Sequence, residues 1–358
     1  MALIYNDLFI LALFSNTQAK KGSTVFHILQ GKRTASILYR AVDYSLEPFF
    51  GFFPQLDRSV FYQKLEELTS MGHLLYAHDS KEYLLSQMGE NSVRQYLSDH
   101  YQPHHLNWLT QGRLVRDVQR KIYFLTQILS EIRYENKRYL PVEKEYDIQQ
   151  WVKRWIAIQS KPLKELAAAF GMEWKILLSS LETENAVILV HLMSGHGIVG
   201  LTKKQLAQQM NISELEITVR QYDSMSYLIQ QIYEIYQQVP LLASIVKDTA
   251  TPNKNGLSHS AKETALLLEK GFSIEKIVHI RRLKKSTISE HLIELVILFP
   301  TVEIEPFIPK EIYTSLKTLL ADSPEVSFQE ASDRLVNLEF WWFRLMQIER
   351  RRANEGKN

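Results

Sequence analysis

The stretch from Leu257 to Phe299 is the part of the sequence that most restricts how the chain can fold. Apolar residues recur in it at the three- and four-residue spacing of an amphipathic helix, and two short polar breaks interrupt the pattern. Residues suited to begin or end helices stand at its start and at the breaks: Ser258 or Ser260, Gly271, Ser273 and Ser286. We therefore predict three short helices in a helix-turn-helix unit, the third starting at Thr287.

Cations gather just before the predicted third helix, with no acidic residue among them. In a helix-turn-helix that reads DNA, the last helix presents its N-terminal residues to the major groove, and its first backbone amides can meet a phosphate. We predict DNA contacts from Arg281, Arg282, Lys284, Lys285, Ser286, Thr287 and Ser289. The alternative is a packing or protein-binding module, because helix-turn-helix geometry also serves that purpose.

Several of these residues carry a resemblance to a known family. They are Glu263-Thr264, Gly271 to Ile274, Ile277, Arg281, Leu283, Ser286 to Ile288 and His291-Leu292. The stretch resembles the helicase helix-turn-helix domain found at the C-terminus of some RecQ-type helicases and in YpbB-like proteins of Firmicutes. The segment Phe26 to Thr34 resembles the YpbB-like proteins too, whereas Val278 departs from the alanine usual in the domain. The resemblance implies a DNA-linked accessory role beside a RecQ-type helicase, without catalysis.

Composition limits the remaining possibilities. The chain has 358 residues, 45% of them hydrophobic, so it can form two or three domains with buried cores. Its 42 Lys and Arg nearly balance 40 Asp and Glu, so DNA binding would depend on local patches of charge. The absence of cysteine excludes disulfides and thiolate zinc sites. We expect a cytoplasmic protein, because no apolar run reaches the roughly 20 residues of a membrane helix.

The N-terminal residues 1–105 predict a winged-helix-like domain. Asp57 can cap a helix from Arg58 to about Met71, and residues 73–85 read as two short strands around a polar turn. The outward face of this helix mixes both charges, so we predict phosphate contacts from Lys32 and Arg33 instead. A winged helix that dimerises or binds protein is the alternative.

Residues 106–248 predict a helical middle domain. A long helix from Leu109 to Arg138 carries many bases, and residues 202–213 have the spacing of a second helix-turn-helix. Its last helix begins with Glu214 and Glu216, whose carboxylates would repel phosphate, so a structural or protein-binding role is favoured. Residues 247–256 read as a flexible linker to a C-terminal domain at 257–352.

The last helix, from about Ser327 to Arg352, contains four consecutive aromatic residues. Four in a row must face both sides of a helix, which indicates burial between domains or against a partner. We predict partner contacts from Phe340, Trp341 and Trp342.

No motif for catalysis is present. The sequence lacks a phosphate-binding loop, a nucleophile elbow and a metal-binding histidine helix, and Ser194 to Gly197 match no such pattern. We predict a mainly α, non-enzymatic protein without a cofactor or metal that works with DNA and a RecQ-type helicase in repair or recombination. A sequence-specific transcription regulator and a protein adaptor without DNA contact are the alternatives. Neither the DNA preference nor the oligomeric state follows from the sequence.

Overall fold

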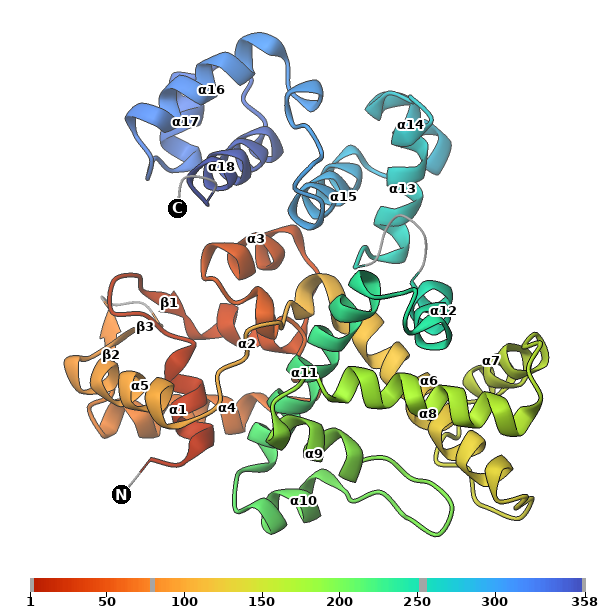
Figure 1. Ribbon diagram of the computed structural model, residues 1–358. Coiled ribbons are helices and arrows are strands. Elements are labelled where there is room, and N and C mark those ends of the chain that lie inside the picture. Colours follow the sequence, from red (N-terminus) through yellow and green to blue (C-terminus); the bar gives the residue numbers. More distant parts are fainter. Residues whose placement is uncertain (1–2, 78–80, 251–255, 356–358) are drawn as a thin grey trace. The chain divides into compact units, whose positions relative to one another are not determined.

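The computed structural model describes residues 3–77, 81–250 and 256–355, and most of them are helical (Figure 1). The predicted mainly α fold is therefore confirmed. The chain divides into two compact units that are each built from two segments. Unit 1 contains Met1–Val25 and Leu56–Asn255, and unit 2 contains Phe26–Gln55 and Gly256–Asn358. The helix α2 (Gly22–Gln30) contains the point at which the chain passes from one unit to the other.

Unit 1 begins with the winged-helix-like part. Its elements are α1 (Tyr5–Ala12), β1 (Lys20–Lys21), α4 (Arg58–Ser70), β2 (Leu74–Ala77), β3 (Glu82–Leu85) and α5 (Gln87–Asp99). The strands form an antiparallel sheet in the order β1-β3-β2, as in a winged helix. The Asp57 carboxylate accepts a hydrogen bond from the Val60 amide at 3.0 Å and so caps α4 as predicted. Residues 78–80, in the predicted polar turn, lie outside the described residues.

The rest of unit 1 is helical and centred on α6. Its helices are α6 (Trp108–Arg133), α7 (Tyr146–Ala157), α8 (Leu163–Leu178), α9 (Thr183–His191), α10 (Lys203–Met210), α11 (Glu214–Glu234) and α12 (Pro240–Thr249). Helix α6 packs against α7, α8, α11 and α12. The apolar stripe of α6 is buried along its length: Val115, Val118, Ile122, Leu125 and Leu129. The helix ends at Arg133, before the predicted Arg138, because Glu135 has a left-handed backbone with φ of 57°.

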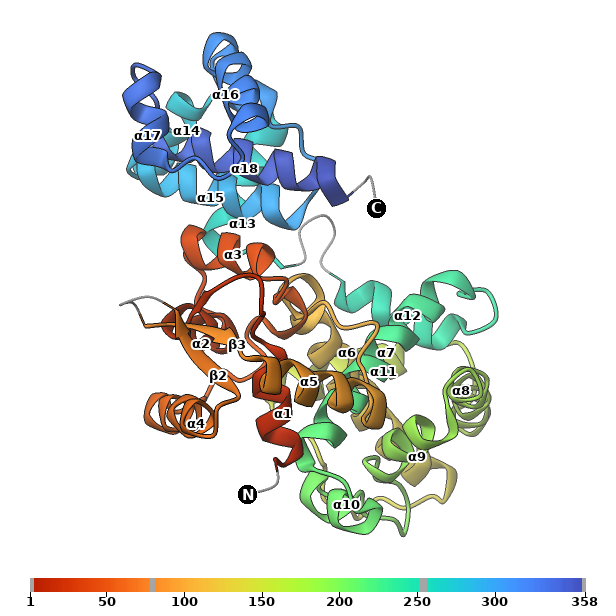
Figure 2. The same ribbon diagram turned by 90° about the vertical axis from the view of Figure 1, so that its left-hand side faces the viewer.

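Unit 2 is built around α15. Its elements are α3 (Ala35–Asp43), η1 (Glu47–Phe49), α13 (His259–Glu269), α14 (Ile274–Arg281), α15 (Lys285–Leu298), η2 (Glu305–Phe307), α16 (Lys310–Asp322), α17 (Phe328–Arg334) and α18 (Phe340–Glu355). Helix α15 packs against α3, α13, α14 and α18 (Figure 2). Its apolar residues join one core with the aromatic residues of α18, since Leu292, Val296, Trp341 and Phe343 are all buried there.

The structure divides the chain differently from the three predicted domains. Residues 26–55 belong to unit 2, and the rest of the N-terminal part shares unit 1 with the middle helices. The physical reason is the packing of α3 on α15, which buries Tyr39 in the core of unit 2. The Arg344 guanidinium of α18 lies 3.8 Å from the centroid of the Tyr39 ring. Of the predicted linker, residues 247–249 end α12, and residues 251–255 lie outside the described residues.

Candidate nucleic-acid interface

Helices α13, α14 and α15 form the predicted helix-turn-helix. The hydroxyls of Ser258 and Ser273 cap α13 and α14 by accepting hydrogen bonds from Ala261 N and Lys276 N, both at 3.3 Å. Between α14 and α15 the chain turns at Arg282, whose φ of 52° is left-handed. The third helix starts earlier than predicted, because its N-cap is Lys284 rather than Ser286.

The start of α15 differs from those of α13 and α14. Its N-cap residue, Lys284, makes no side-chain capping hydrogen bond. The first amides of a helix carry partial positive charge, and without a cap they remain available to an anion. Lys284 and Ser286 are exposed on either side of the first helical residue. This end of α15 therefore has the chemistry of a phosphate contact.

Most of the remainder of α15 is buried. Ile293, Glu294 and Ser289 are each less than 5% exposed. Helices α3 and α18 cover the sides of α15 that α13 and α14 leave free. The Ser289 hydroxyl donates to the Lys285 carbonyl at 2.9 Å, so Ser289 is not available for the predicted DNA contact. Exposed residues of α15 lie at its start, in the first turn, and at Glu290 in the second turn.

Arg281 also points into the unit rather than toward solvent. Its guanidinium donates to the Ser260 carbonyl at 2.6 Å, to the Thr264 hydroxyl and to the Glu263 carboxylate, and its side chain is only 10% exposed. These partners all belong to α13, so Arg281 ties α14 to α13 and is not free for the predicted phosphate contact. The Thr264 hydroxyl also lies 2.8 Å from Nδ1 of His291 on α15, and burial lowers the pKa of His291.

The remaining predicted cations of the turn fall into two groups. Arg282 and Lys284 are exposed, and neither side chain has a polar partner within the described parts of the chain. Lys285 is half-exposed, but its Nζ lies 2.7 Å from Oε1 of Glu339 in the segment before α18. Thr287 is partly exposed on the first turn of α15. The turn therefore presents two unpaired cations and one paired cation.

The two predicted phosphate contacts in the N-terminal segment also differ in availability: one is paired with a carboxylate and the other is exposed. The Arg33 guanidinium donates to Oε1 of the buried Glu294 at 2.8 Å and 3.1 Å, which leaves it a structural role within unit 2. Lys32 is exposed and remains available. Adjacent cations in the sequence thus have different surroundings, and the sequence alone contains no signal that distinguishes them.

The predicted partner residues are largely part of the core of unit 2. Trp341 is 7% exposed, and its indole N–H donates to Oε2 of Glu339 at 2.8 Å, so it is not available as a partner contact. Trp342 is partly buried, and its ring centroid lies 5.8 Å from Lys285 Nζ. Phe340 is exposed, with its ring edge against Phe328. Sequence reasoning missed Glu339, although an acidic residue directly before four aromatics was a visible signal.

Helices α10 and α11 of unit 1 repeat the geometry of α14 and α15. Asn211 has a φ of 55°, and the Ile212 amide donates to the Ala207 carbonyl at 3.1 Å. The corresponding bond of the C-terminal unit joins the Leu283 amide to the Val278 carbonyl at 3.3 Å. The turn after Val278 therefore has the same backbone hydrogen bond as the turn after Ala207, although valine is larger than alanine.

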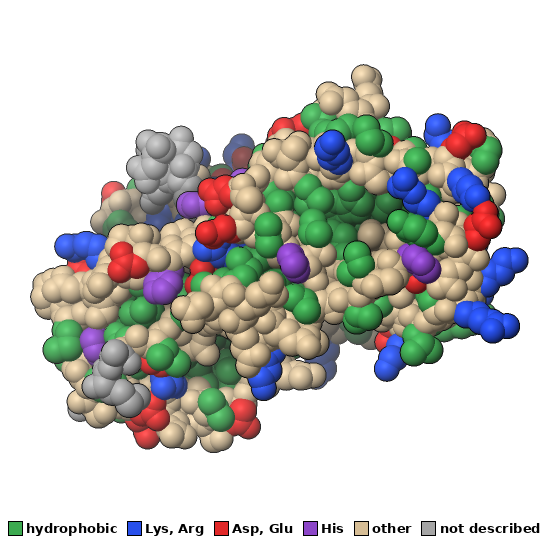
Figure 3. All heavy atoms as spheres, turned by 60° about the horizontal axis from the view of Figure 1, so that its bottom comes forward, with side chains coloured by type: hydrophobic (Ala, Val, Ile, Leu, Met, Phe, Trp, Pro, Cys, Tyr) green, Lys and Arg blue, Asp and Glu red, His purple; other side chains and the backbone are tan. Residues whose placement is uncertain are grey.

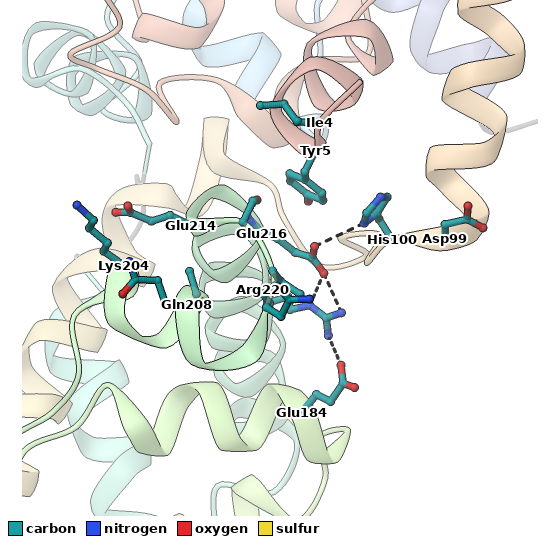
Figure 4. Close-up of a pocket in the computed structure, with 14 residues that line it drawn as sticks. Ile4, Tyr5, Asp99, His100, Glu184, Lys204, Gln208, Glu214, Glu216 and Arg220 are labelled. Atoms are coloured by element: carbon teal, nitrogen blue, oxygen red, sulfur yellow. Dashed lines mark hydrogen bonds and ion pairs between the residues drawn. The ribbon is translucent and has the colours of Figure 1, made fainter. Parts of the chain in front are cut away.

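The start of α11 lies beside a cavity of about 810 Å³ that α1 and α5 also line (Figure 4). Arg220 lies 2.9 Å from Oε1 of the buried Glu216 and 3.0 Å from Glu184, and His100 Nδ1 is 3.6 Å from Oε2 of Glu216. Burial lowers the pKa of nearby Lys203 to about 8. Since the Glu216 carboxylate lies at this helix start and pairs with Arg220 of the same helix, the start does not have the free positive character of α15.

Unit 1 also exposes a set of apolar side chains (Figure 3). Helices α8 and α9 and the loop after α9 expose Met172, Ile176, Val187, Val190, Ile198 and Val199. In the parts of the chain that the structure describes, no helix combines the length and apolarity required to cross a bilayer. Exposed apolar surface of this kind is common where proteins contact one another.

Comparison with known proteins agrees with this geometry. Residues 260–347 match a family described as a helix-turn-helix domain, so the match covers α13 to α15 and continues into α18. The chain is also similar to Protein YpbB of Bacillus subtilis (strain 168), with 26% identity over 312 residues that cover 87% of each protein. No solved structure matches the chain. The resemblance noted in the sequence therefore extends over most of the chain.

Proposed function

We propose that the protein binds DNA through the turn between α14 and α15, by contacts to the phosphate backbone. The observation that carries the proposal is the start of α15, where an uncapped helix end stands beside the exposed Arg282 and Lys284 inside a helix-turn-helix domain. Helix amides and unpaired cations both favour phosphate. Exposed Ser286 adds a hydroxyl that can donate to the same group.

The packing of α15 favours backbone contact over sequence reading. A transcription regulator lays the outer face of this helix in the major groove to reach base edges. Here α3 and α18 pack on α15, and Ile293 and Ser289 are buried. We therefore favour a protein that recognises DNA by its charge and shape over the alternative of a sequence-specific regulator.

We further propose that the protein is a non-catalytic, cytoplasmic accessory of a RecQ-type helicase in DNA repair or recombination. The partner rests on the resemblance of the sequence, and the exposed apolar side chains of α8 and α9 support a protein partner of some kind. The second candidate is a protein adaptor without DNA contact, and the exposed apolar side chains of α8 and α9 also favour it.

The test is binding of the full chain to single-stranded, duplex and forked DNA over a series of salt concentrations. We expect binding that weakens with salt, and we expect Lys284→Gln to weaken it about fivefold and lower the salt slope by about 0.9. Lys310→Gln is the matched control, because Lys310 is also an exposed residue at a helix start but belongs to α16. Equal effects of both substitutions, or no binding at low salt, would reject the DNA site.

The helicase partner needs its own experiment. A purified RecQ-type helicase would be assayed for unwinding of forked DNA with and without the protein, and for direct association by gel filtration. We expect a complex and a change in unwinding. Val187→Asp on α9 should weaken the complex without changing DNA binding, and a lack of any complex would leave the DNA-binding role without this partner.

A further inference from the structure

The Glu339 side chain contacts the first residue of the uncapped helix α15. Its Oε1 accepts a hydrogen bond from Lys285 Nζ at 2.7 Å, and Lys285 is the first residue of α15. The pair is open to solvent, since the Lys285 side chain is 51% exposed and that of Glu339 is 35% exposed. A carboxylate is an anionic acceptor like a phosphate, so Glu339 fills one of the positions that a DNA phosphate would use.

The carboxylate is also held in place from the other side. Oε2 of Glu339 accepts a hydrogen bond from the indole N–H of Trp341 at 2.8 Å, and Trp341 is buried in the core of unit 2. The Glu339 carbonyl accepts from the Phe343 amide, which fixes the backbone at the start of α18. An ordinary surface glutamate would swing away at little cost, whereas this one is anchored at both its backbone and its second oxygen.

We propose that Glu339 weakens DNA binding at the α14–α15 turn by holding Lys285 in the place of a phosphate. This inference rests on the proposed DNA-binding function and names the residue that limits its strength. A DNA phosphate that binds Lys285 must either displace the Glu339 carboxylate or lie beside its negative charge. Both reduce the binding free energy that the Lys285–phosphate contact contributes. Lys284, which has no such partner among the described residues, contributes its full charge.

The proposal predicts that Lys285 and Glu339 act together, whereas Lys284 acts alone. We would measure the DNA affinity of the full chain and of Glu339→Gln, each alone and combined with Lys285→Gln or Lys284→Gln. Glu339→Gln should tighten binding about fivefold and steepen the salt slope by about 0.9. Lys285→Gln should weaken binding less than about twofold in the natural chain but about fivefold in Glu339→Gln. Lys284→Gln should weaken it by the same factor in both.

Two controls separate this effect from general changes in charge or stability. Glu311→Gln removes the same charge from the first turn of α16, a helix that contacts α18 at Glu349 through Tyr313 and not at Glu339. Trp341→Phe keeps an aromatic ring but removes the indole N–H, so it should tighten binding by part of the Glu339→Gln effect. The urea midpoint of each variant verifies that the protein remains folded.

The outcomes distinguish the two proposals. If Lys284→Gln weakens binding but Glu339→Gln changes nothing, or if Lys285→Gln has the same effect in both backgrounds, Glu339 does not limit affinity and the DNA site remains. If Glu311→Gln tightens binding as much as Glu339→Gln, the effect is one of net charge and the inference is wrong. If no variant binds DNA at low salt, the proposed function and this inference fail together.

Discussion

Arg33 and Glu294 stand 261 positions apart in the sequence, yet Arg33 Nη2 lies 2.8 Å from Glu294 Oε1. Glu294 is 3% exposed, and its carboxylate also accepts hydrogen bonds from the amide and hydroxyl of Ser258, each at 2.8 Å. This one carboxylate therefore joins the N-terminal segment of unit 2 to the start of α13. The helix-turn-helix is completed by a segment from the opposite end of the chain.

Replacing Arg33 should destabilise the protein, because it leaves the buried Glu294 carboxylate with Ser258 alone. We expect Arg33→Met to lower the free energy of unfolding by about 2 kcal/mol, since Arg33 itself is partly exposed. Lys32→Met is the control, and its change should stay within about 0.5 kcal/mol. Urea denaturation of both variants checks this, and equal stability would show that the pair does not hold the segment in place.

Arg281 and Arg282 are neighbours whose substitutions should act in opposite ways. Arg281→Gln should cost about 2–3 kcal/mol of stability, because Thr264 and Ser260 lose a charged donor. Arg282→Gly should instead raise stability by about 0.5–1 kcal/mol, since glycine adopts the left-handed backbone without strain, while DNA binding weakens. Calorimetry and DNA titration on each variant test this. If the Arg281→Gln variant is folded but binds DNA more weakly, Arg281 contacts DNA after all and the prediction is wrong.

The stability of unit 2 should fall as the solution becomes acidic. Burial, and then the neighbouring Arg281, lower the pKa of His291 from its usual 6.5, while Glu294 and Glu263 act in the opposite direction. The unfolded chain therefore binds a proton at a higher pH than the folded chain. Stability is complete above about pH 6.5 and is lost progressively until the pH falls below the pKa of the folded state.

The His291→Asn variant tests this dependence, because asparagine offers Thr264 an acceptor but does not titrate. Unfolding in urea would be measured between pH 7.5 and pH 5 for the natural chain and the variant. We expect the natural chain to lose more stability over this range than His291→Asn. Parallel pH profiles would mean that other groups cause the acid sensitivity.

Neighbouring aromatic residues of α18 should differ strongly in how much they contribute to the free energy of unfolding. Trp341 is buried in the core of unit 2, so Trp341→Ala should cost about 3–5 kcal/mol. Phe340 is 43% exposed, and Phe340→Ala should cost about 1 kcal/mol or less. Thermal unfolding monitored by circular dichroism compares the two. A small effect at Trp341 would contradict its place in the core and restore the predicted partner contact.

Local features of the sequence were sufficient to predict much of the fold. Ser258, Ser273 and Asp57 cap the helices that we expected, and the apolar stripe of α6 is buried as its spacing indicates. Capping and amphipathic spacing depend on residues within one or two turns of each other, so they can be read from a short stretch of chain. The helix-turn-helix was recognisable for the same reason.

The tertiary structure decided which of the predicted site residues remain available. Arg33, Arg281 and Ser289 have the right chemistry and position in the sequence for DNA contact, but each bonds to a group of unit 2. Their availability depends on α3, α13 and α18, which come from stretches as far as 261 positions away. Periodicity identifies the helices, whereas only packing between distant segments determines which charges are buried in pairs and which remain for a partner.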